Sequence, residues 1–302
     1  MKKNIPHLKE ERAFSNLALV VMLIITAICF IPFILILSAS FSSEAAITEF
    51  GYQLWPKEFS LNAYTYLWSR KATILQCFGV SLFVTVVGTA SSSIIASMCA
   101  YPMSRKDFPL RNVLAFFLFV PMVFNGGMTA SYILWAKYLN VKNTIWALLL
   151  PNALVSSMNI LMIRNYYSMN VPYSLVEAAK IDGAPEIFIY SRIVLPLSKP
   201  VIATTALFTG IGYWNNWTNG MYYITDPNYY TLTLYLKKLL DNINLIRTST
   251  IATEMGSISS MALPSNSLKM AIVLVTIIPI LVIYPFVQKQ LVKGLVVGAV
   301  KG

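Results

Sequence analysis

Side chains that commonly carry out covalent chemistry are few in this 302-residue chain. Its three cysteines, Cys29, Cys77 and Cys99, all lie in apolar runs, and its single histidine, His7, lies in a polar segment. An odd number of cysteines without CxxC or cysteine and histidine spacing favours neither a disulfide framework nor a zinc site. The sequence contains no Walker-type GxxxxGK[ST], HExxH or GxSxG motif. We therefore expect a protein that is not an enzyme, with the cysteines as small packing residues.

One polar segment has a spacing with a clear structural meaning. Ser174 followed three residues later by Glu177 is a capping box, in which each side chain accepts a hydrogen bond from a free amide at the start of a helix. Gly183 stands where a left-handed residue would end that helix, and Pro185 suits the first turn of a second one. The pattern predicts a helix, a sharp turn and another helix.

The same segment is suited to close contact with a neighbour. The small pair Ala178 and Ala179 would allow a backbone or pocket wall to approach, and apolar anchors flank it, at Leu175, Val176, Ile187 and Phe188. This is the pattern of a helix that sits in a partner's groove. From the residues alone, an interfacial connector lying on lipid remains an equal alternative.

The elements around this segment are apolar enough to cross a membrane. The chain is 57% hydrophobic and 12% charged, with a mean hydropathy of +0.64, which excludes a soluble enzyme of ordinary composition. A spanning helix needs about 20 mostly apolar residues. Six stretches qualify, at 16–41, 74–100, 111–134, 143–164, 200–224 and 268–288. The first has too long an apolar run for a cleavable signal peptide, so we expect it to remain as an anchor.

The distribution of lysine and arginine predicts the orientation. With six spans both termini share one side, and that side carries fourteen of the 23 basic residues. The positive-inside rule then places both termini in the cytoplasm, and it accounts for the net charge of +11 without a nucleic-acid partner. The expected organisation is a cytoplasmic N-terminal tail (1–15), a first helix (16–41), an external loop (42–73), a five-helix core (74–288) with an external loop at 225–267, and a cytoplasmic C-terminal tail (289–302).

The fifth predicted span contains residues suited to binding a sugar. Aromatic rings stack on the apolar faces of pyranoses, and amides bond their hydroxyl groups. Tyr213, Asn216 and Trp217 would share one helical face, and Asn215 and Asn219 would form a second. Hydrogen bonding between helices, with an interfacial aromatic belt, explains the same residues equally well.

The segment with the capping box also resembles a known family. The EAA signature of permease subunits of ATP-binding-cassette importers is matched by Glu177-Ala178-Ala179, Gly183 and Ile193-x-Leu195-Pro196. Asp182 and Ala184 fill the DGA variant of the sugar-importing branch. The LplC-like branch, whose members resemble the G subunit of the maltose importer, is similar at 124–127, 143–151, 159–164, 213–217 and 292–302.

The resemblance implies a fold and a set of partners. It implies an all-α integral membrane protein of six transmembrane helices with the MetI-like fold of type I importer permeases. Such a chain forms half of a heterodimeric pore in the bacterial cell membrane and imports oligosaccharides or polysaccharide fragments. The implied partners are a homologous second permease, two ATP-binding subunits that hold ATP and Mg, an external solute-binding lipoprotein or periplasmic protein, and membrane lipid. No cofactor is implied in this chain.

The resemblance also assigns roles to residues. The coupling helix, at about 174–188, would dock on an ATPase through Glu177, Ala178, Ala179, Asp182 and Gly183, with helix capping as the alternative for Glu177. The C-terminal tail is similar to tails that reach into the ATPase dimer, with a disordered end as the alternative. A permease for another solute is the main alternative function. A secondary transporter is a weaker one, because no internal repeat and no acidic residue in the centre of a span are visible.

Overall fold

The computed structural model describes residues 6–124, 126–151, 154–248 and 266–299. Within these ranges the secondary structure is helical apart from an isolated antiparallel bridge between Ser42 and Phe59. The helices form two compact units, which are residues 1–71 with 239–277 (unit 1) and residues 72–238 with 278–302 (unit 2). The boundaries between the units fall after residue 71 and inside two helices, α14, Leu232–Thr248, and α16, Asn266–Ala299.

Two helices of the described residues are long and apolar enough to cross a bilayer, Phe14–Ser40 and Lys71–Ser104. They belong to α1, Pro6–Ser40, and α4, Lys71–Ser104, and match the first two predicted spans. Two pairs of helices, each bent at a short break, would raise the number of spans to four if each pair is counted as one span. A shorter apolar helix, Asn266–Val282, covers most of the sixth predicted span. The count of six spans stays a prediction.

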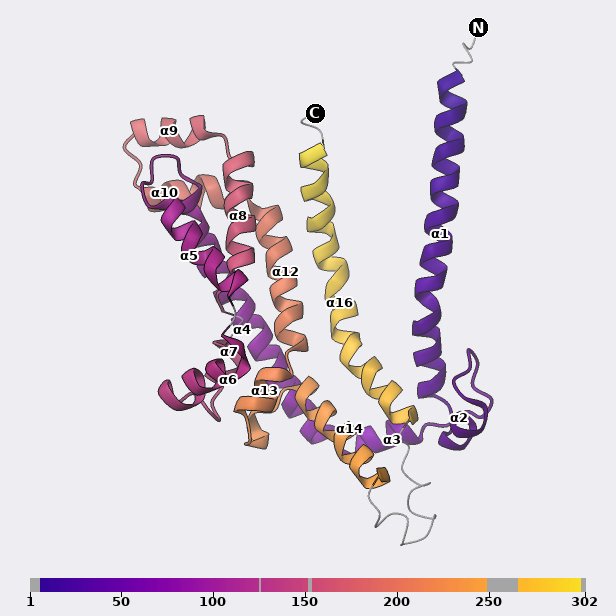
Figure 1. Cartoon of the computed structure of the whole chain (residues 1–302). Helices are drawn as coiled ribbons and strands as arrows, with labels where there is room; N and C mark the ends of the chain where they lie inside the picture. Colours follow the sequence, from indigo (N-terminus) through magenta and orange to yellow (C-terminus); the bar gives the residue numbers. More distant parts are fainter. Residues whose placement is uncertain (1–5, 125, 152–153, 249–265, 300–302) are drawn as a thin grey trace. The chain divides into compact units, whose positions relative to one another are not determined.

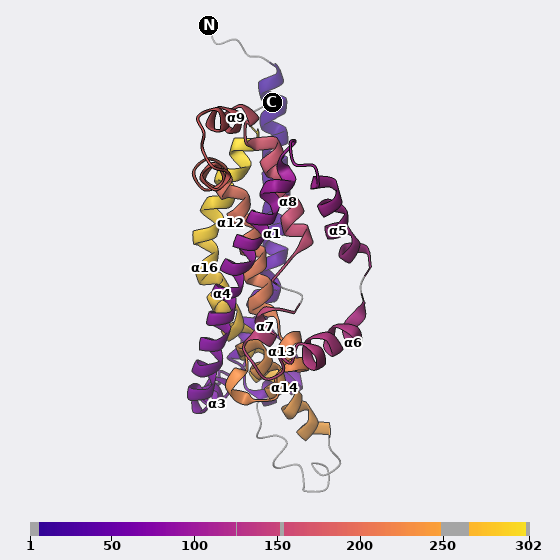
Figure 2. The same ribbon diagram turned by 90° about the vertical axis from the view of Figure 1, so that its left-hand side faces the viewer.

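The third predicted span is bent rather than straight. It consists of α5, Arg111–Val123, followed by α6, Gly127–Tyr132, and the π-helix η1, Ile133–Tyr138, with a bend of 118° between α5 and the second part (Figure 2). Gly127 has φ +77°, a conformation that ordinary residues rarely adopt. Gly126 and Gly127 therefore stand where the second part of the span begins, whereas Asn125 lies outside the described residues.

The fourth and fifth predicted spans are wrong as single helices. Residues 143–164 contain a short α7, Trp146–Leu149, and the start of α8, Ser157–Asn170. Pro151 follows α7, and a proline has no amide hydrogen with which to continue a helix. Residues 200–224 divide between α12, Lys199–Asn215, and α13, Thr218–Tyr223. Asn216 ends α12 with a non-helical ψ of 87°.

Unit 1 joins the first long helix to two short ones, α2, Glu44–Phe50, and α3, Asn62–Ser69. The Ser40 hydroxyl lies 2.9 Å from the Tyr64 hydroxyl, and the Phe41 ring stacks on that of Tyr64 at 4.9 Å. The Glu44 carboxylate accepts hydrogen bonds from the backbone amides of Asn266 and Ser267 at 2.9–3.2 Å. A carboxylate at the first amides of a helix is stabilising, so Glu44 positions the start of α16.

Unit 2 is built around α4, α8 and α12, which run side by side (Figures 1 and 2). Serine hydroxyls and small residues of α4 bring these helices together. The Ser97 hydroxyl lies 2.7 Å from that of Tyr167 on α8 and 2.8 Å from that of Tyr190. Ser97 therefore has a packing role in unit 2.

The segment with the EAA signature lies at one end of these helices (Figure 1). It comprises α9, Tyr173–Ile181, then α10, Glu186–Ile189, the π-helix η2, Tyr190–Val194, and α11, Leu195–Leu197. We refer to α9, α10 and the residues between them as the turn segment, 173–189. A buried cluster anchors it to the helices and includes Ala100, Ile163, Val176, Ile189 and Val201. The remaining described elements are η3, Pro227–Tyr229, and the first part of α14.

Candidate functional site

The first helix of the turn segment starts earlier than the capping box predicts. Pro172 is the N-cap residue of α9, in an extended conformation, and no side chain caps the helix. Ser174 is therefore inside the first turn, and the predicted capping box is wrong. Proline fixes φ near −65° and needs no amide partner, so Pro172 can begin the helix without a capping hydroxyl. Because no side chain caps α9, helix capping is excluded as the alternative role of Glu177.

The end of α9 has the geometry predicted from Gly183. Gly183 has φ +77°, and nothing lies within 4 Å of the position where a Cβ would be. The Ala184 amide donates to the Ala179 carbonyl at 3.0 Å, and the Gly183 amide donates to the Lys180 carbonyl at 3.0 Å. These two hydrogen bonds form a Schellman motif, which satisfies the last carbonyls of the helix. The predicted helix, turn and helix is confirmed, with Pro185 as the N-cap of α10.

The turn segment has a buried face and an exposed face. Val176 is 3% exposed, and Ala179 and Ala184 pack against the same buried cluster. Glu177, Ala178, Asp182 and Gly183 are exposed. The two alanines of the signature thus differ, because Ala178 faces outward while Ala179 packs inward. Among the described residues the Glu177 carboxylate has no hydrogen-bonding or ionic partner.

Large apolar side chains also lie on the exposed face. Ile181 is 86% exposed and Ile187 is 63% exposed, and Leu175 and Phe188 are about half exposed. Exposed apolar residues grouped beside an unpaired carboxylate are typical of an interaction surface. Of the four anchors expected from the sequence, Val176 alone packs inward.

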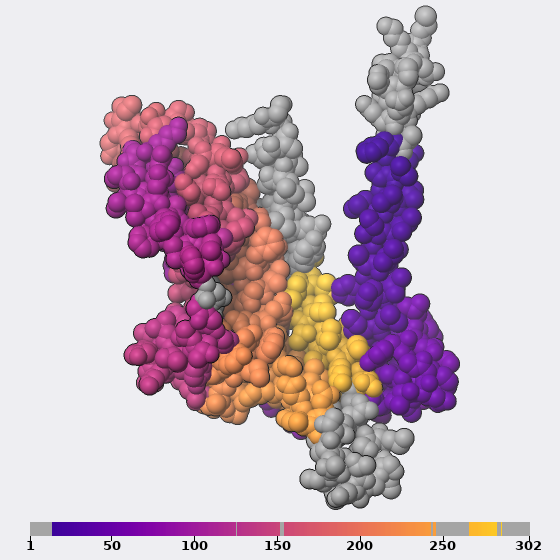
Figure 3. Space-filling view, in the orientation of Figure 1, coloured from indigo at the N-terminus to yellow at the C-terminus, as the bar shows by residue number. Residues whose placement is uncertain are grey.

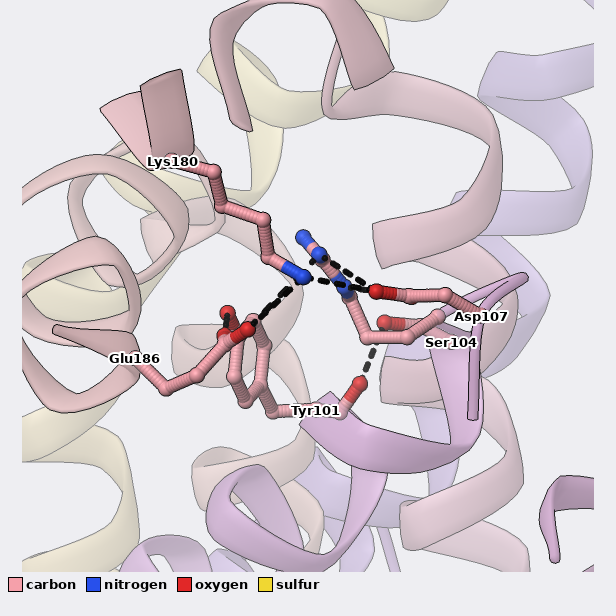
Figure 4. Close-up of polar contacts among 6 residues, drawn as sticks. Tyr101, Ser104, Asp107, Lys180 and Glu186 are labelled. Atoms are coloured by element: carbon pink, nitrogen blue, oxygen red, sulfur yellow. Dashed lines mark hydrogen bonds and ion pairs between the residues drawn. The ribbon is translucent and has the colours of Figure 1, made fainter. Parts of the chain in front are cut away.

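Five polar residues hold the turn segment to the end of α4, and we call them the ionic cluster. They are Tyr101, Arg105, Asp107, Lys180 and Glu186. Figure 4 labels Tyr101, Asp107, Lys180 and Glu186. The Lys180 ammonium lies 2.6 Å from Asp107 Oδ2 and 2.9 Å from Glu186 Oε1. The Tyr101 hydroxyl donates to Glu186 Oε2 at 2.5 Å. Lys180 and Glu186 flank Gly183, so the cluster fixes both sides of the turn.

The charges of this cluster perturb one another. Hydrogen bonds from Lys180 and then from Arg105 hold the pKa of Asp107 well below its usual range. Hydrogen bonds to Asp107 and Glu186 raise the pKa of Lys180. Both residues are therefore charged throughout the neutral range.

The meeting of these five residues could not be predicted from the sequence. Asp107 and Lys180 are 73 positions apart, Asp107 in a short polar connector and Lys180 in the predicted helix. A clue was available in the single acid of Arg105-Lys106-Asp107 and in the opposite charges on either side of Gly183. Neither clue pairs the two segments.

The structure separates the residues predicted to share a face of the fifth span. The predicted face of Tyr213, Asn216 and Trp217 is wrong, because α12 ends at Asn215. Tyr213 is 3% exposed and donates to the Leu149 carbonyl at 2.9 Å. Trp217 is 38% exposed, and its ring lies 5.7 Å from the Lys237 ammonium.

The second predicted face is also divided by the break. Asn215 is exposed at the last position of α12. Asn219 is 3% exposed in α13 and donates to the Pro151 carbonyl at 2.9 Å. Asn216 Oδ1 accepts from the Asn219 amide at 3.1 Å and so organises the break itself. Asn215, Asn216 and Trp217 are thus the members of the original set with accessible side chains.

The described residues offer no metal-binding group, since no three histidine, cysteine or acidic side chains converge among them. The surface of the turn segment, coloured pink, lies beside that of residues 105–115, coloured magenta, at one end of unit 2 (Figure 3). The turn segment is suited to binding a partner, because its exposed helix α9 is rigidly attached to the long apolar helices.

Comparison with known proteins finds a matching family, relatives in Bacillus subtilis and a similar solved structure. A family model described as binding-protein-dependent transport system inner membrane component matches residues 92–297. Protein LplC of Bacillus subtilis is 38% identical over 276 residues, covering 91% of this chain and 90% of that protein. The polygalacturonan/rhamnogalacturonan transport system permease protein YtcP of the same organism is 37% identical over 293 residues, covering 97% and 100%. A crystal structure of a bacterial ABC transporter involved in the import of the acidic polysaccharide alginate has a chain that matches with a TM-score of 0.75 and 30% identity, covering 93% of this chain and 97% of that one.

Proposed function

Because this chain belongs to the family of binding-protein-dependent transport system inner membrane components, we propose that it forms one half of a heterodimeric pore that imports oligosaccharides or polysaccharide fragments. Membership of this family makes the chain a transport subunit rather than an enzyme. It also sets aside the secondary transporter considered from the sequence. The other half of the pore would be a homologous permease.

The observation that carries the proposal is the exposed face of the turn segment. Glu177 and Ala178 are exposed beside Ile181, while Val176 and the ion pair of Lys180 with Asp107 attach α9 to the rest of unit 2. A rigid connection of this kind can transmit movement of a docked subunit to the membrane helices. We propose that Glu177, Ala178, Asp182 and Gly183 form the surface that an ATP-binding subunit contacts, with Ala179 supporting it from beneath.

The energy source would lie outside this chain. Two ATP-binding subunits would hold ATP and Mg, and an external solute-binding protein or lipoprotein would deliver the sugar. The proposed orientation has both termini in the cytoplasm, which places the turn segment on the side where the ATP-binding subunits would be.

The substrate class rests on the relatives. Their names include polygalacturonan/rhamnogalacturonan and arabinooligosaccharide transport permeases. We propose that Asn215, Asn216 and Trp217 face the sugar, because the break between α12 and α13 leaves these side chains accessible and supplies amides beside an aromatic ring. Tyr213 and Asn219 would instead hold that break in place.

Substitutions at Gly183 test the docking surface. Gly183→Val forces a β-branched residue into the left-handed region, at a cost of about 1–2 kcal/mol, and should reorient the exposed face. The expected result in the assembled complex, reconstituted with its binding protein, is loss of sugar-stimulated ATP hydrolysis with normal membrane insertion.

A matched control is Gly183→Asn, because asparagine tolerates the left-handed conformation and nothing crowds its Cβ. This variant should keep most of the stimulation. Full stimulation in Gly183→Val would refute the docking assignment. Purification of the tagged chain without any ATP-binding subunit, under conditions that preserve a control complex, would refute the proposed assembly.

A further inference from the structure

A cavity of about 390 Å³ lies beside the turn segment, within unit 2. Its walls come from the end of α4, the start of α5, the second half of α8 and the start of α9. Binding sites for small molecules commonly measure roughly 300–1,000 Å³. The cavity is therefore large enough for a small polar group.

The charge of its walls is of one sign. Four basic residues line the cavity, Arg105, Lys106, Arg111 and Arg164, and none of the described residues that line it is acidic. Arg164 donates through Nε to the Met103 carbonyl at 3.2 Å, which leaves its two terminal nitrogens without a protein acceptor among the described residues. Arg111 has no acidic partner among them.

A buried donor at this site also lacks an acceptor. Arg105 is only 7% exposed, and its Nη1 has no hydrogen-bond partner, although Nε and Nη2 bind Asp107. A buried charged donor left without an acceptor is costly. Proteins typically bind a phosphate group with converging arginines whose N–H donors are free to contact it.

We propose that this cavity binds the phosphate of an anionic phospholipid headgroup. Arg105 and Lys106 follow the end of α4, Arg111 begins α5 and Arg164 lies in the second half of α8. These positions are at or next to the predicted cytoplasmic ends of the second, third and fourth spans. Anionic lipids attract basic groups at that surface. The site is separate from the exposed face of Glu177 and Ala178 that the proposed function uses.

The surface next to the cavity favours a lipid over free phosphate. Arg111, which lines the cavity, is the first residue of α5. One turn and more beyond it α5 exposes large apolar side chains, with Phe116 63%, Phe117 66% and Phe119 54% exposed. A headgroup in the cavity would therefore have an apolar surface beside it for its acyl chains.

Lipid retention by the full-length chain tests this site. The chain is purified in detergent, mixed with equal amounts of phosphatidylglycerol and phosphatidylcholine, and the retained lipids are counted by native mass spectrometry. The wild type should retain phosphatidylglycerol preferentially. Arg111→Gln combined with Arg164→Gln should lower that retention by roughly tenfold or more, because charge-assisted contacts to the phosphate are lost.

Arg192→Gln is the matched control, since Arg192 is exposed on the same predicted side and does not line the cavity. Equal retention by the double variant and the wild type would overturn the proposal. Loss in the control as well would overturn it in favour of general surface charge.

Two measurements on the wild type keep the test independent of variant folding and of transport. Phosphatidylglycerol bound in the cavity should resist millimolar inorganic phosphate and should dissociate as ionic strength rises. If the cavity binds inorganic phosphate and shows no preference for phosphatidylglycerol, it is a phosphate site and the proposal that its ligand is a lipid is overturned. Retention of phosphatidylcholine equal to that of phosphatidylglycerol would overturn both.

Discussion

Gly88 allows Tyr213 to pack against the backbone of α4. A Cβ at Gly88 would lie 2.5–2.7 Å from three atoms of the Tyr213 ring, closer than real contacts. The ring is buried, and its hydroxyl is held by the Leu149 carbonyl. This residue, which the sequence suggested for a substrate path, instead ties α12 to α4 and to the end of α7.

Gly88→Ala should therefore destabilise the protein. The overlap with the ring should cost about 1–3 kcal/mol, more than the roughly 1 kcal/mol that alanine gains over glycine in a helix. Thermal unfolding of the purified protein measures the change. Gly79→Ala is the control on the same helix, because nothing lies within 4 Å of its Cβ position, and its melting temperature should not fall. Equal melting temperatures for the two variants would contradict the close packing of Tyr213.

Trp217 is expected to act on transport rather than on folding. Its ring is 38% exposed, so Trp217→Ala should leave the amount of folded protein unchanged. If the ring stacks on a sugar, its loss should cost about 0.5–1.5 kcal/mol, or roughly a two- to tenfold fall in uptake. Uptake of labelled oligosaccharide by membrane vesicles, normalised to folded protein, measures it. A matched loss of folded protein would instead favour a packing role.

At the scale of elements, the turn segment depends on the ionic cluster as well as on its apolar anchors. Lys180 bridges Asp107 and Glu186, so one ammonium connects the α4 end to both helices of the turn. The side chains of Lys180, Asp107 and Glu186 are partly exposed, and ion pairs of this kind contribute modestly to stability. Their geometric effect is larger, because they fix where α9 presents its exposed face.

The cluster should show no titration in the neutral range. The lowered pKa of Asp107 stabilises the fold above its unfolded pKa of about 3.9, and the contribution is lost as the pH falls through the folded value. The raised pKa of Lys180 stabilises it below about 10.4, and the contribution is lost as the pH rises through the folded value. Between pH 6 and 8, hydrogen exchange in peptides covering 173–189, corrected for intrinsic rates, should be constant.

In the same measurement Asp107→Asn should increase exchange in the turn segment. Asp182→Asn removes an equal charge from an exposed position of the same region and should leave exchange unchanged. If exchange in the wild type changes between pH 6 and 8, or if the two variants exchange equally, the ionic cluster does not hold the turn segment in place.

At the scale of the whole molecule, the described helices expose long apolar surfaces. In α1 none of the most apolar window is buried, and α5 has no buried residue. Surfaces of this extent mark contact with a membrane or with protein partners. Such helices are typical of a chain that completes its packing in lipid and in a larger assembly.

The predicted orientation can be checked on this scale with single cysteines. In a chain whose native cysteines are replaced by alanine, Lys57→Cys should react with an impermeant maleimide on intact right-side-out cells. Met169→Cys, 84% exposed, should react only after the membrane is opened. Reaction of both on intact cells, or the reverse pattern, would contradict cytoplasmic termini.

The sequence by itself determined the class of protein and the form of the turn segment. Composition and span length depend on each residue's own polarity, and a left-handed glycine between two helices is a local property of the backbone. These features could be inferred without knowing any distant contact. The EAA signature at 177–196 is also a local pattern, so the family could be inferred from the sequence as well.

Only the tertiary structure decided which residues meet. The capping box failed because Pro172 begins α9, and the shared face of the fifth span failed because α12 ends at Asn215. The ionic cluster joins segments more than seventy positions apart, and the basic cavity is assembled from four separate helices. Such contacts depend on how helices pack and where they break, and that outcome is set by the sum of many weak interactions across the chain rather than by any local pattern.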